Sequence, residues 1–398
     1  MSPKTTSRPQ APITVGSVGS LRIDRLPVVA LALTLLVAVG CDDGATPPFA
    51  APVNYRAGIE ALGEQIFNDT NLSSPPGQSC ATCHSQARAF TDARPDGPTS
   101  QGAVEGVFGV RNAPTVAYLA FAPPLHFSDA DQTYEGGLFV DGRVNSLEAQ
   151  MQKPLLNPLE MNNADAEEVM AKIRVAAYAP ELVGIFGQGA LDDAKMGFDA
   201  IAQAVAAFER TPIFQPFSSK YDLYLQHRTG LSKQELRGLR LFQEPSKGNC
   251  AACHPSTPGV ADARALFTDF SYDNIGIPKN PSNPYYTLAA DLNPEGANHL
   301  DHGLATTLAD PAQDGRFRVP TLRNIAVTAP YGHNGFFADL KSIVRFYNTR
   351  DTDPTWPAPE IPGTVNRDEL GHLGLSDAEV DDVVAFLGTL SDGYAATP

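Results

Sequence analysis

Two short runs, Cys80-Ala81-Thr82-Cys83-His84 and Cys250-Ala251-Ala252-Cys253-His254, decide how this chain folds. Each has the pattern C-x-x-C-H, in which two thiols bond to the vinyl groups of a c-type haem and the histidine becomes the proximal ligand of the iron. A zinc site, a redox dithiol and a structural disulfide are the alternatives. The two runs lie too far apart for an ordinary set of zinc ligands, and a dithiol does not need a histidine beside it twice. We therefore expect two covalently bound haems c.

Length and composition fit a two-domain haem protein. The chain has 398 residues, of which 42% are hydrophobic, 33 are glycine and 34 are proline. The length favours two domains, and the many glycines and prolines indicate much irregular chain around a cofactor that fills core volume. The formal net charge of −16 argues against a nucleic acid as a partner. It would attract a basic redox protein, and the alternative is that it serves solubility alone.

The N-terminal segment predicts export. Residues 26–40 are apolar and follow two arginines, and they are too few to span a bilayer comfortably but fit the core of a signal peptide. Ala38-Val39-Gly40-Cys41 resembles a lipoprotein cleavage box, so we expect residues 1–40 to be a lipoprotein-type signal peptide and Cys41 to be lipidated. Residues 41–54 then form a tether. The mature protein is expected on the periplasmic side, held at a membrane only by its lipid anchor; simple cleavage without lipid is the alternative.

The two halves of the chain carry similar signals in the same order, which indicates a duplication. Helical spacing predicts a helix over residues 55–68, ahead of the first C-x-x-C-H run. A capping box formed by Ser232 and Glu235 predicts one ahead of the second. The matching peptides after the runs are Phe90-Thr91-Asp92 and Phe267-Thr268-Asp269, Pro114-Thr115 and Pro320-Thr321, and Asp141-Gly142-Arg143 and His333-Asn334-Gly335.

Further helices complete each half. Two are expected at about 164–176 and 194–210, and a third begins after Ser376. We therefore predict an all-α fold of two duplicated cytochrome-c-like haem domains with much irregular chain. The N-terminal domain would cover residues 55–215 and the C-terminal domain residues 216–398.

The supply of possible ligands limits the sixth coordination position of each iron. The second half contains no methionine, so a His/Met haem within that half is excluded, and its histidines and tyrosines remain as candidates. In the first half no histidine occurs between His84 and His126. The first haem is therefore expected to be five-coordinate and open, with Met151, Met161 or His126 as the alternative sixth ligand.

At this point the chain resembles the bacterial di-haem cytochrome c peroxidase and MauG family over roughly residues 55–395. The resemblance rests on several motifs taken together rather than on any one of them. They are Ser79-Cys80-Ala81-Thr82-Cys83-His84, Arg111-Asn112-Ala113-Pro114-Thr115, Asp141-Gly142-Arg143, Leu147-Glu148-Ala149-Gln150, Asn157-Pro158-Leu159-Glu160-Met161, Pro320-Thr321-Leu322-Arg323-Asn324 and Thr328-Ala329-Pro330-Tyr331-Gly332-His333-Asn334-Gly335.

The resemblance implies catalytic and ligand residues. Gln150 and Glu160 match the glutamine and glutamate beside the family's open haem, where a carboxyl group can relay a proton during cleavage of peroxide. Tyr347 matches the position of the second haem's distal ligand, which is methionine in the classical peroxidases and tyrosine in MauG-like members. Taken without the resemblance, Glu160 would be an ordinary loop acid and Tyr347 a packed aromatic residue.

The resemblance also implies a calcium ion and one departure from the family. Asn112, Thr328 and Pro330 match positions that hold calcium between the domains through oxygen atoms, which this ion prefers. The family usually has a tryptophan just before Asp-Gly-Arg, as an electron relay between the haems. This chain has Val140 there, and its one tryptophan, Trp356, lies in a proline-rich stretch.

The function expected from these residues is reduction of hydrogen peroxide at the N-terminal haem. Electrons would pass through the C-terminal haem from a small cytochrome c or cupredoxin or, as in MauG, from a side chain of a protein that is being oxidised. Peroxidases of this family are often dimers, so a homodimer is among the expected assemblies. The alternative is a non-enzymatic, membrane-tethered di-haem electron-transfer cytochrome in which both sixth positions are filled.

Overall fold

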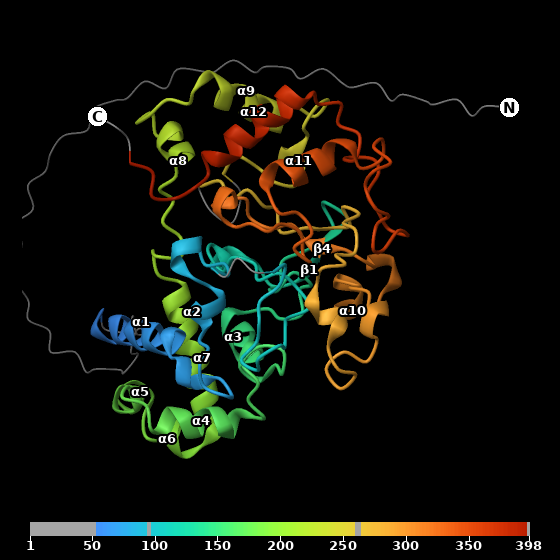
Figure 1. The fold of residues 1–398 in the computed structure, drawn as a ribbon. Coiled ribbons are helices and arrows are strands. Elements are labelled where there is room, and N and C mark those ends of the chain that lie inside the picture. Colours follow the sequence, from blue (N-terminus) through green and yellow to red (C-terminus); the bar gives the residue numbers. More distant parts are fainter. Residues whose placement is uncertain (1–52, 94–96, 259–263, 396–398) are drawn as a thin grey trace, which may run out of the picture. The chain divides into compact units, whose positions relative to one another are not determined.

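Short helices joined by long irregular segments make up most of the fold (Figure 1). The structure, a computed structural model, describes residues 53–93, 97–258 and 264–395. The predicted signal peptide (1–40), the lipidation site Cys41 and nearly all of the predicted tether lie outside these residues. Within them the chain is rich in helix and has little sheet, as the predicted fold class requires.

The α-helices are α1 (Val53–Asn68), α2 (Cys80–Cys83), α3 (Leu147–Leu156), α4 (Ala166–Arg174), α5 (Ala179–Phe186), α6 (Gly189–Asp192), α7 (Ala194–Glu209), α8 (Lys220–Leu225), α9 (Lys233–Gln243), α10 (Leu304–Leu308), α11 (Leu340–Thr349) and α12 (Asp377–Gly388). Single 3₁₀ turns lie at Thr70–Leu72, Gln86–Arg88, Leu119–Phe121, Cys250–Ala252, Pro284–Thr287, Gly296–Asn298, Pro311–Gln313 and Ile325–Val327. The strands are β1 (His126–Ser128), β2 (Thr133–Glu135), β3 (Tyr272–Asp273) and β4 (Phe317–Arg318), which pair as β1–β2 and β3–β4, both antiparallel.

The predicted helices are confirmed close to their expected bounds. Helices α1, α4 and α7 cover the expected segments 55–68, 164–176 and 194–210 to within two residues at each end. Both predicted capping boxes are present: Ser232 with Glu235 opens α9, and Ser376 with its partner three residues later opens α12. Each box satisfies backbone N–H groups that would otherwise lack partners at a helix start.

Two helix pairs cross at a glycine, and these crossings organise the two halves. Helix α1 crosses α7 at Gly63, where an added Cβ would lie 2.0 Å from the carbonyl oxygen of Ala204. Helix α9 crosses α12 at Gly238, where an added Cβ would lie 1.9 Å from the carbonyl oxygen of Asp382. Only glycine allows the two backbones to approach this closely. Figure 1 shows α1 lying against α7 and α9 against α12.

Each crossing is the centre of an apolar core. The larger core gathers around α1, α4 and α7, and its fully buried members include Leu62, Ile66, Val169, Met170, Leu182, Ile201 and Phe214. The smaller core gathers around α9 and α12 and includes Phe242, Phe267, Val380, Val383, Phe386 and Leu390. Removal of these side chains from water is the main driving force that holds the helices together.

A buried ion pair also helps to fix the second core. The guanidinium of Arg323, of which 1% is exposed, donates to both carboxylate oxygens of Asp222 at 2.9 and 3.0 Å. Its Nε donates to the carbonyl oxygen of Ala265 at 2.8 Å. Burial alone would raise the pKa of Asp222, but the bonds from Arg323 outweigh it and the pKa is lowered. This carboxylate is therefore charged at neutral pH.

One matching turn differs from the register that the sequence suggested. An isolated bridge closes the turn at Leu138 and Val144 in the first half and at Tyr331 and Phe337 in the second. These bridges align Gly142 with Gly335, one residue away from the expected pairing of Gly142 with Asn334. Both glycines have positive φ, 71° and 64°, a conformation that favours glycine at this point of the turn.

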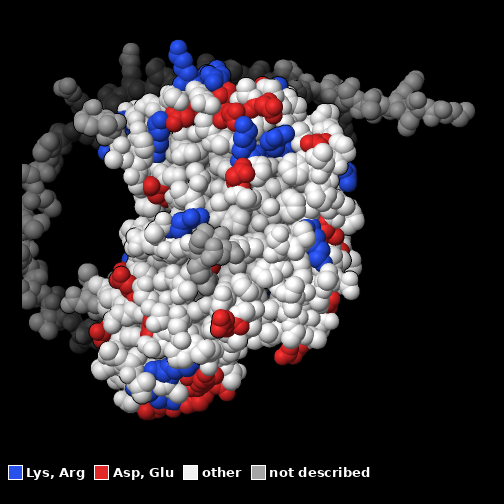
Figure 2. All heavy atoms as spheres, in the orientation of Figure 1, with Lys and Arg blue, Asp and Glu red and all other residues white. Residues whose placement is uncertain are grey.

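Charges of both signs lie on the surface of the described chain. On the face drawn in Figure 2, acidic and basic side chains are interspersed and no broad basic field appears among the coloured residues. Among the residues that the structure describes, none of the helices has the length and apolar character needed to cross a bilayer.

Candidate functional site

The two C-x-x-C-H runs fold into the same local shape. Each forms one helical turn in which the backbone N–H of the histidine donates to the carbonyl oxygen of the first cysteine. The distance is 2.9 Å between His84 and Cys80 and 2.9 Å between His254 and Cys250. Within one turn, the two thiols and the imidazole are thus held together, as attachment of one porphyrin requires.

A backbone carbonyl orients each histidine ring. Nδ1 of His84 lies 3.1 Å from the carbonyl oxygen of Phe90, and Nδ1 of His254 lies 2.8 Å from that of Phe267. Both phenylalanines have positive φ, 61° and 54°, which is uncommon for a bulky residue and turns the carbonyl toward the ring. Because Nδ1–H donates to this oxygen, Nε2 is left to bind a metal.

Burial keeps both imidazoles neutral. It lowers the pKa of His84, and it lowers the pKa of His254 to about 4. A neutral imidazole is the form that ligates iron. Across the described ranges (53–93, 97–258, 264–395), no three His, Cys, Asp or Glu side chains gather into a metal site. The donor sets at the two runs therefore suit a haem better than the alternative zinc site.

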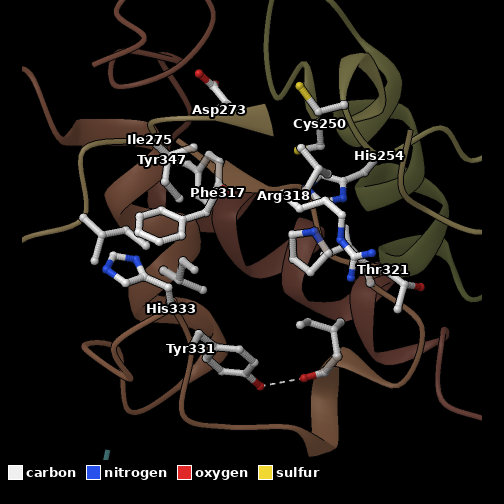
Figure 3. A pocket seen from close by; sticks show the side chains of 18 of the residues that line it. Cys250, His254, Asp273, Ile275, Phe317, Arg318, Thr321, Tyr331, His333 and Tyr347 are labelled. Atoms are coloured by element: carbon white, nitrogen blue, oxygen red, sulfur yellow. Dashed lines mark hydrogen bonds between the residues drawn. The ribbon is translucent and has the colours of Figure 1, made fainter. Parts of the chain in front are cut away.

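A cavity of about 290 Å³ lies at the second run (Figure 3). Cys250, Cys253 and His254 line one side of it, and Tyr347 from α11 lines another, with much of the remaining wall apolar. Burial raises the pKa of the Tyr347 phenol far above its ordinary value. The predicted distal ligand and the predicted proximal histidine thus lie on the wall of one cavity.

Unpaired polar atoms line the same cavity. His333 stacks on Phe317 with the ring centroids 3.8 Å apart, and neither of its ring nitrogens has a hydrogen-bond partner within the described chain. Its Nε2 lies 3.5 Å from Oε2 of Glu360, without the geometry of a hydrogen bond. Arg318, labelled beside His254 in Figure 3, also leaves its buried Nε unsatisfied. Unmet polar groups on an apolar wall suit a flat apolar ring with charged propionates, so the residues fit a haem.

The predicted catalytic residues of the first half lie close to the α3 helix. Gln150 is buried on α3, with 8% of its surface exposed. Glu160 follows α3, and its Oε1 accepts a hydrogen bond of 2.6 Å from the amide of Asn157. Burial raises the pKa of Glu160 despite the opposing effects of Asn157 and the charge of Arg143. Glu160 and the thiol of Cys80 also lie close enough for the carboxylate charge to raise the cysteine's pKa.

The alternative sixth ligands of the first half occupy different surroundings. His126 lies on the exposed β1–β2 hairpin, with Nδ1 3.0 Å from the carbonyl oxygen of Pro124. Met151 and Met161 are buried in the larger core. Of the three, His126 thus has no buried setting of the kind that a haem pocket offers.

The residues of the implied calcium site lie together. The side-chain amide of Asn112 donates to the carbonyl oxygen of Pro330 at 2.7 Å, and Thr328 borders the same cavity as both. Nearby, Arg88 donates to the carbonyl oxygen of Ala329 at 3.2 Å. This contact between Asn112 and Pro330 joins the two halves of the chain at the expected site.

Sequence reasoning missed a buried charge network beside this cavity. Arg111 donates to Asp141 at 2.6 Å and to both oxygens of Asp301 at 2.6 and 2.7 Å. The charge of Arg111 outweighs burial and holds the pKa of Asp301 well below its ordinary range. Arg111 and Asp141 belong to motifs noted above, but nothing local to the sequence pairs them with Asp301.

Comparison with known proteins identifies the family. A family model described as di-haem cytochrome c peroxidase matches residues 58–230. The methylamine utilization protein MauG of Paracoccus denitrificans is 41% identical over 388 residues, which cover 92% of this chain and 95% of that protein. The chain belongs to the di-haem cytochrome c peroxidase and MauG family. It is therefore an oxidoreductase of a family whose members carry two haems c.

Other relatives include both peroxidases, which form one branch of this family, and MauG-like proteins, which form the other. Cytochrome c551 peroxidase of Nitrosomonas europaea is 30% identical and covers 86% of this chain and 83% of its own length. Among solved structures, the di-haem peroxidase BthA of Burkholderia thailandensis has a TM-score of 0.74 at 38% identity, covering 84% of this chain and 86% of its own. A MauG-like protein associated with microbial copper homeostasis has a TM-score of 0.64 at 30% identity, covering 87% and 94%.

Proposed function

We propose that this protein reduces hydrogen peroxide at its N-terminal haem site and receives electrons through its C-terminal haem site. The observation that carries this assignment is a difference between two helices. The N-cap of α3 is Ser146 and that of α11 is Asp339. Counted from these N-caps, Pro154 of α3 and Tyr347 of α11 occupy the same position. Proline has no atom that can bind iron, whereas the tyrosine borders the cavity of His254. When bound, a haem with an open position supplies the redox chemistry, and one with both positions filled transfers electrons.

The equivalence of α3 and α11 depends on a duplicated fold, which we also propose. Support comes from contacts that recur in both halves: the histidine-to-phenylalanine-carbonyl contact, the glycine at each helix crossing and a threonine bond near the haem run. In that last pair Thr115 donates to the carbonyl oxygen of Ala89 and Thr321 to that of Leu266. On this interpretation residues 55–215 and 216–398 are two cytochrome-c-like domains.

In the first pocket, Glu160 and Gln150 have separate tasks. Reduction of peroxide, H₂O₂ + 2 e⁻ + 2 H⁺ → 2 H₂O, requires protons at the oxygen atoms. Because Asn157 holds Oε1 of Glu160 and burial raises its pKa, Oε2 can take a proton from one peroxide oxygen and return it to the other. Gln150 is buried and does not titrate, so it can orient the peroxide by hydrogen bonds without competing for that proton.

In the second pocket, Tyr347 would bind iron as tyrosinate. Its surroundings favour the neutral phenol, because burial raises its pKa strongly. A metal charge is what would release the proton. A tyrosinate opposite His254 lowers the potential of the haem, which favours the MauG branch. Val140, in place of the usual tryptophan relay, argues for the peroxidase branch. The electron source is therefore either a small cytochrome c or cupredoxin, or a side chain of a protein that is oxidised.

Three further parts of the proposal concern the setting of the protein. Asn112, Thr328 and Pro330 would hold a calcium ion between the halves, supported by the contact of the Asn112 amide with Pro330. The protein would be exported to the periplasmic side and anchored by lipid at Cys41. A homodimer is the assembly that the family suggests.

The resting absorption spectrum of the oxidised holoprotein tests the assignment. We expect a high-spin charge-transfer band from one haem and a low-spin spectrum from the other. Two low-spin haems in every redox state would refute it and support the electron-transfer cytochrome. Adding peroxide without reductant then separates the branches. An immediate spectral change favours the MauG branch, and inertness until one haem is reduced favours the peroxidase branch.

A further inference from the structure

A second buried carboxyl group lies in the first half, apart from Glu160. Glu209 is the last residue of α7, and 6% of its surface is exposed. Its Oε2 is buried and has no hydrogen-bond partner among the described residues. A buried carboxyl oxygen without a partner costs free energy, so its position calls for an explanation.

The helix crossings indicate which way Glu209 faces. An added Cβ on Gly63 would lie 2.9 Å from Cβ of Phe208, and one on Gly238 would lie 2.8 Å from Cβ of Phe386. Phe208 and Phe386 therefore occupy the same place in their helix pairs. The residue that follows Phe208 is Glu209, and its counterpart after Phe386 is Leu387.

The counterpart of Glu209 borders a haem cavity. Leu387 and Val383, four residues earlier on the same face of α12, both line the cavity of His254. By the same register Glu209 borders the first haem site. An electrostatic effect agrees with this placement, because Glu209 lies near enough to Cys80 for its charge to raise the pKa of that thiol.

Helix α3 shows a second position at which the first half has a polar residue and the second half an apolar one. Counting from the caps of α3 and α11, Gln150 of the first pocket stands where Ile343 lines the second cavity. Besides the position of Pro154 and Tyr347, the two pockets thus differ at two matched positions where polar Gln150 and Glu209 replace apolar Ile343 and Leu387. Peroxide chemistry needs polar groups in the first pocket, and the proposed electron-transfer site does not.

We propose that Glu209 is a proton donor of the N-terminal haem pocket that supplies one of the two protons consumed with each peroxide. This role rests on the proposed function. Glu160 can shuttle a proton between the two oxygens, but the net reaction H₂O₂ + 2 e⁻ + 2 H⁺ → 2 H₂O also takes two protons from outside. Glu209 gives up its carboxyl proton to a product oxygen as the electrons arrive from the redox partner, and it is protonated again from solvent.

Charged side chains that reach solvent lie next to Glu209. Beside it, Nη1 of Arg210 lies 2.7 Å from Oε1 of Glu148 on α3, and both side chains reach solvent. Burial raises the pKa of Glu209 to about 8; Arg210 opposes this and Glu148 adds to it. Cys80 of α2 also lies near enough for the charges of Glu209 and Glu160 to raise the pKa of its thiol. At neutral pH Glu209 therefore holds a proton, and it lies between a partly exposed ion pair and the first haem site.

The test compares Glu209→Gln and Glu209→Leu in the full-length holoprotein. Leucine is the residue of the matched position in the second half, so it should pack, and glutamine keeps the shape and hydrogen bonds but carries no transferable proton. Glu167→Gln, an exposed acid on α4 paired with Arg174, is the matched control. Haem content and reduction of the second haem are measured first. The peroxide reaction is then followed by stopped-flow absorption from pH 5 to 9, and the infrared band of a buried carboxylic acid is recorded.

We expect both Glu209 variants to bind two haems and to lose that infrared band. They should react with peroxide at least about tenfold more slowly than the wild type at pH 7. The wild-type rate should fall as the pH rises through about 8, and the variants should lack this fall. The control should match the wild type. Full rescue by glutamine would overturn the inference, because a purely structural role needs no proton, and so would an unchanged pH profile in Glu209→Leu. If the wild type reacts with peroxide and both variants have the wild-type rate and pH profile, this inference is wrong and the proposed function stands. If the wild type is inert to peroxide in every redox state, both the proposed function and this inference are wrong.

Discussion

The same substitution at two glycines of α1 should have opposite effects on stability. Gly58 and Gly63 both lie inside α1. An added Cβ on Gly58 would meet only Cδ1 of Ile185, at an ordinary 3.7 Å. On Gly63 it would lie 2.0 Å from the carbonyl oxygen of Ala204, closer than atoms can approach. The perturbation is therefore Gly58→Ala against Gly63→Ala.

The expected magnitudes follow from these contacts. Alanine favours a helix over glycine by about 1 kcal/mol, so Gly58→Ala should raise the free energy of unfolding by up to that amount. Gly63→Ala has the same intrinsic gain, but the clash is with backbone that moves only if α7 shifts. Overpacking of this kind costs about 1–3 kcal/mol or more, so Gly63→Ala should be destabilising overall.

The assay is guanidinium unfolding of the holoprotein, followed by far-UV circular dichroism, with the Soret absorption read in parallel. Because α7 also carries Glu209, Gly63→Ala should disturb the proposed high-spin haem of the first half and leave the proposed low-spin haem of the second half unchanged. Gly238→Ala, with its Cβ 1.9 Å from the carbonyl oxygen of Asp382, should do the reverse. Equal stabilities of Gly58→Ala and Gly63→Ala would refute the reasoning that the backbones touch at Gly63.

Four further predictions follow from the same structure. Tyr347→Phe should convert the low-spin haem to a high-spin form with a higher reduction potential in spectroelectrochemistry; an unchanged potential would exclude Tyr347 as a ligand. Glu160→Gln should slow the peroxide reaction by about 10²–10⁴-fold in stopped-flow measurements while both haems stay bound. Arg323→Met leaves Asp222 charged and buried, so it should lower the free energy of unfolding by about 3–5 kcal/mol at pH 7. The pKa of Asp222 is lowered in the folded protein, so the ion pair stabilises the fold fully at pH values above the ordinary aspartate pKa. The difference in the free energy of unfolding between Arg323→Met and the wild type should therefore shrink as the pH falls through the lowered pKa of Asp222. A calcium chelator should change the spectrum and the peroxide rate reversibly, and Asn112→Ala should abolish the response to added calcium.

Local patterns in the sequence account for much of the outcome. A capping box such as Ser232 with Glu235 involves one turn of chain, so its helix start is confirmed where it was expected. The hairpin of β1 and β2 was missed, because strands of three residues are too short to show an alternating pattern. Helix α11 was not predicted as an element either, although Tyr347 on it was singled out by resemblance to the family.

The sequence by itself predicted the two runs at which haems attach and excluded a methionine of the second half as ligand of the second iron, because the C-x-x-C-H pattern and the absence of methionine are properties of the chain alone. Tertiary structure decided which side chains meet at each pocket. The carbonyl oxygen of Phe90 reaches His84 through a left-handed backbone, and Glu209 comes near Cys80 in the fold in which α1 crosses α7 at Gly63. Each pocket is assembled from segments far apart in the chain, so the contact between them exists only after the helices pack.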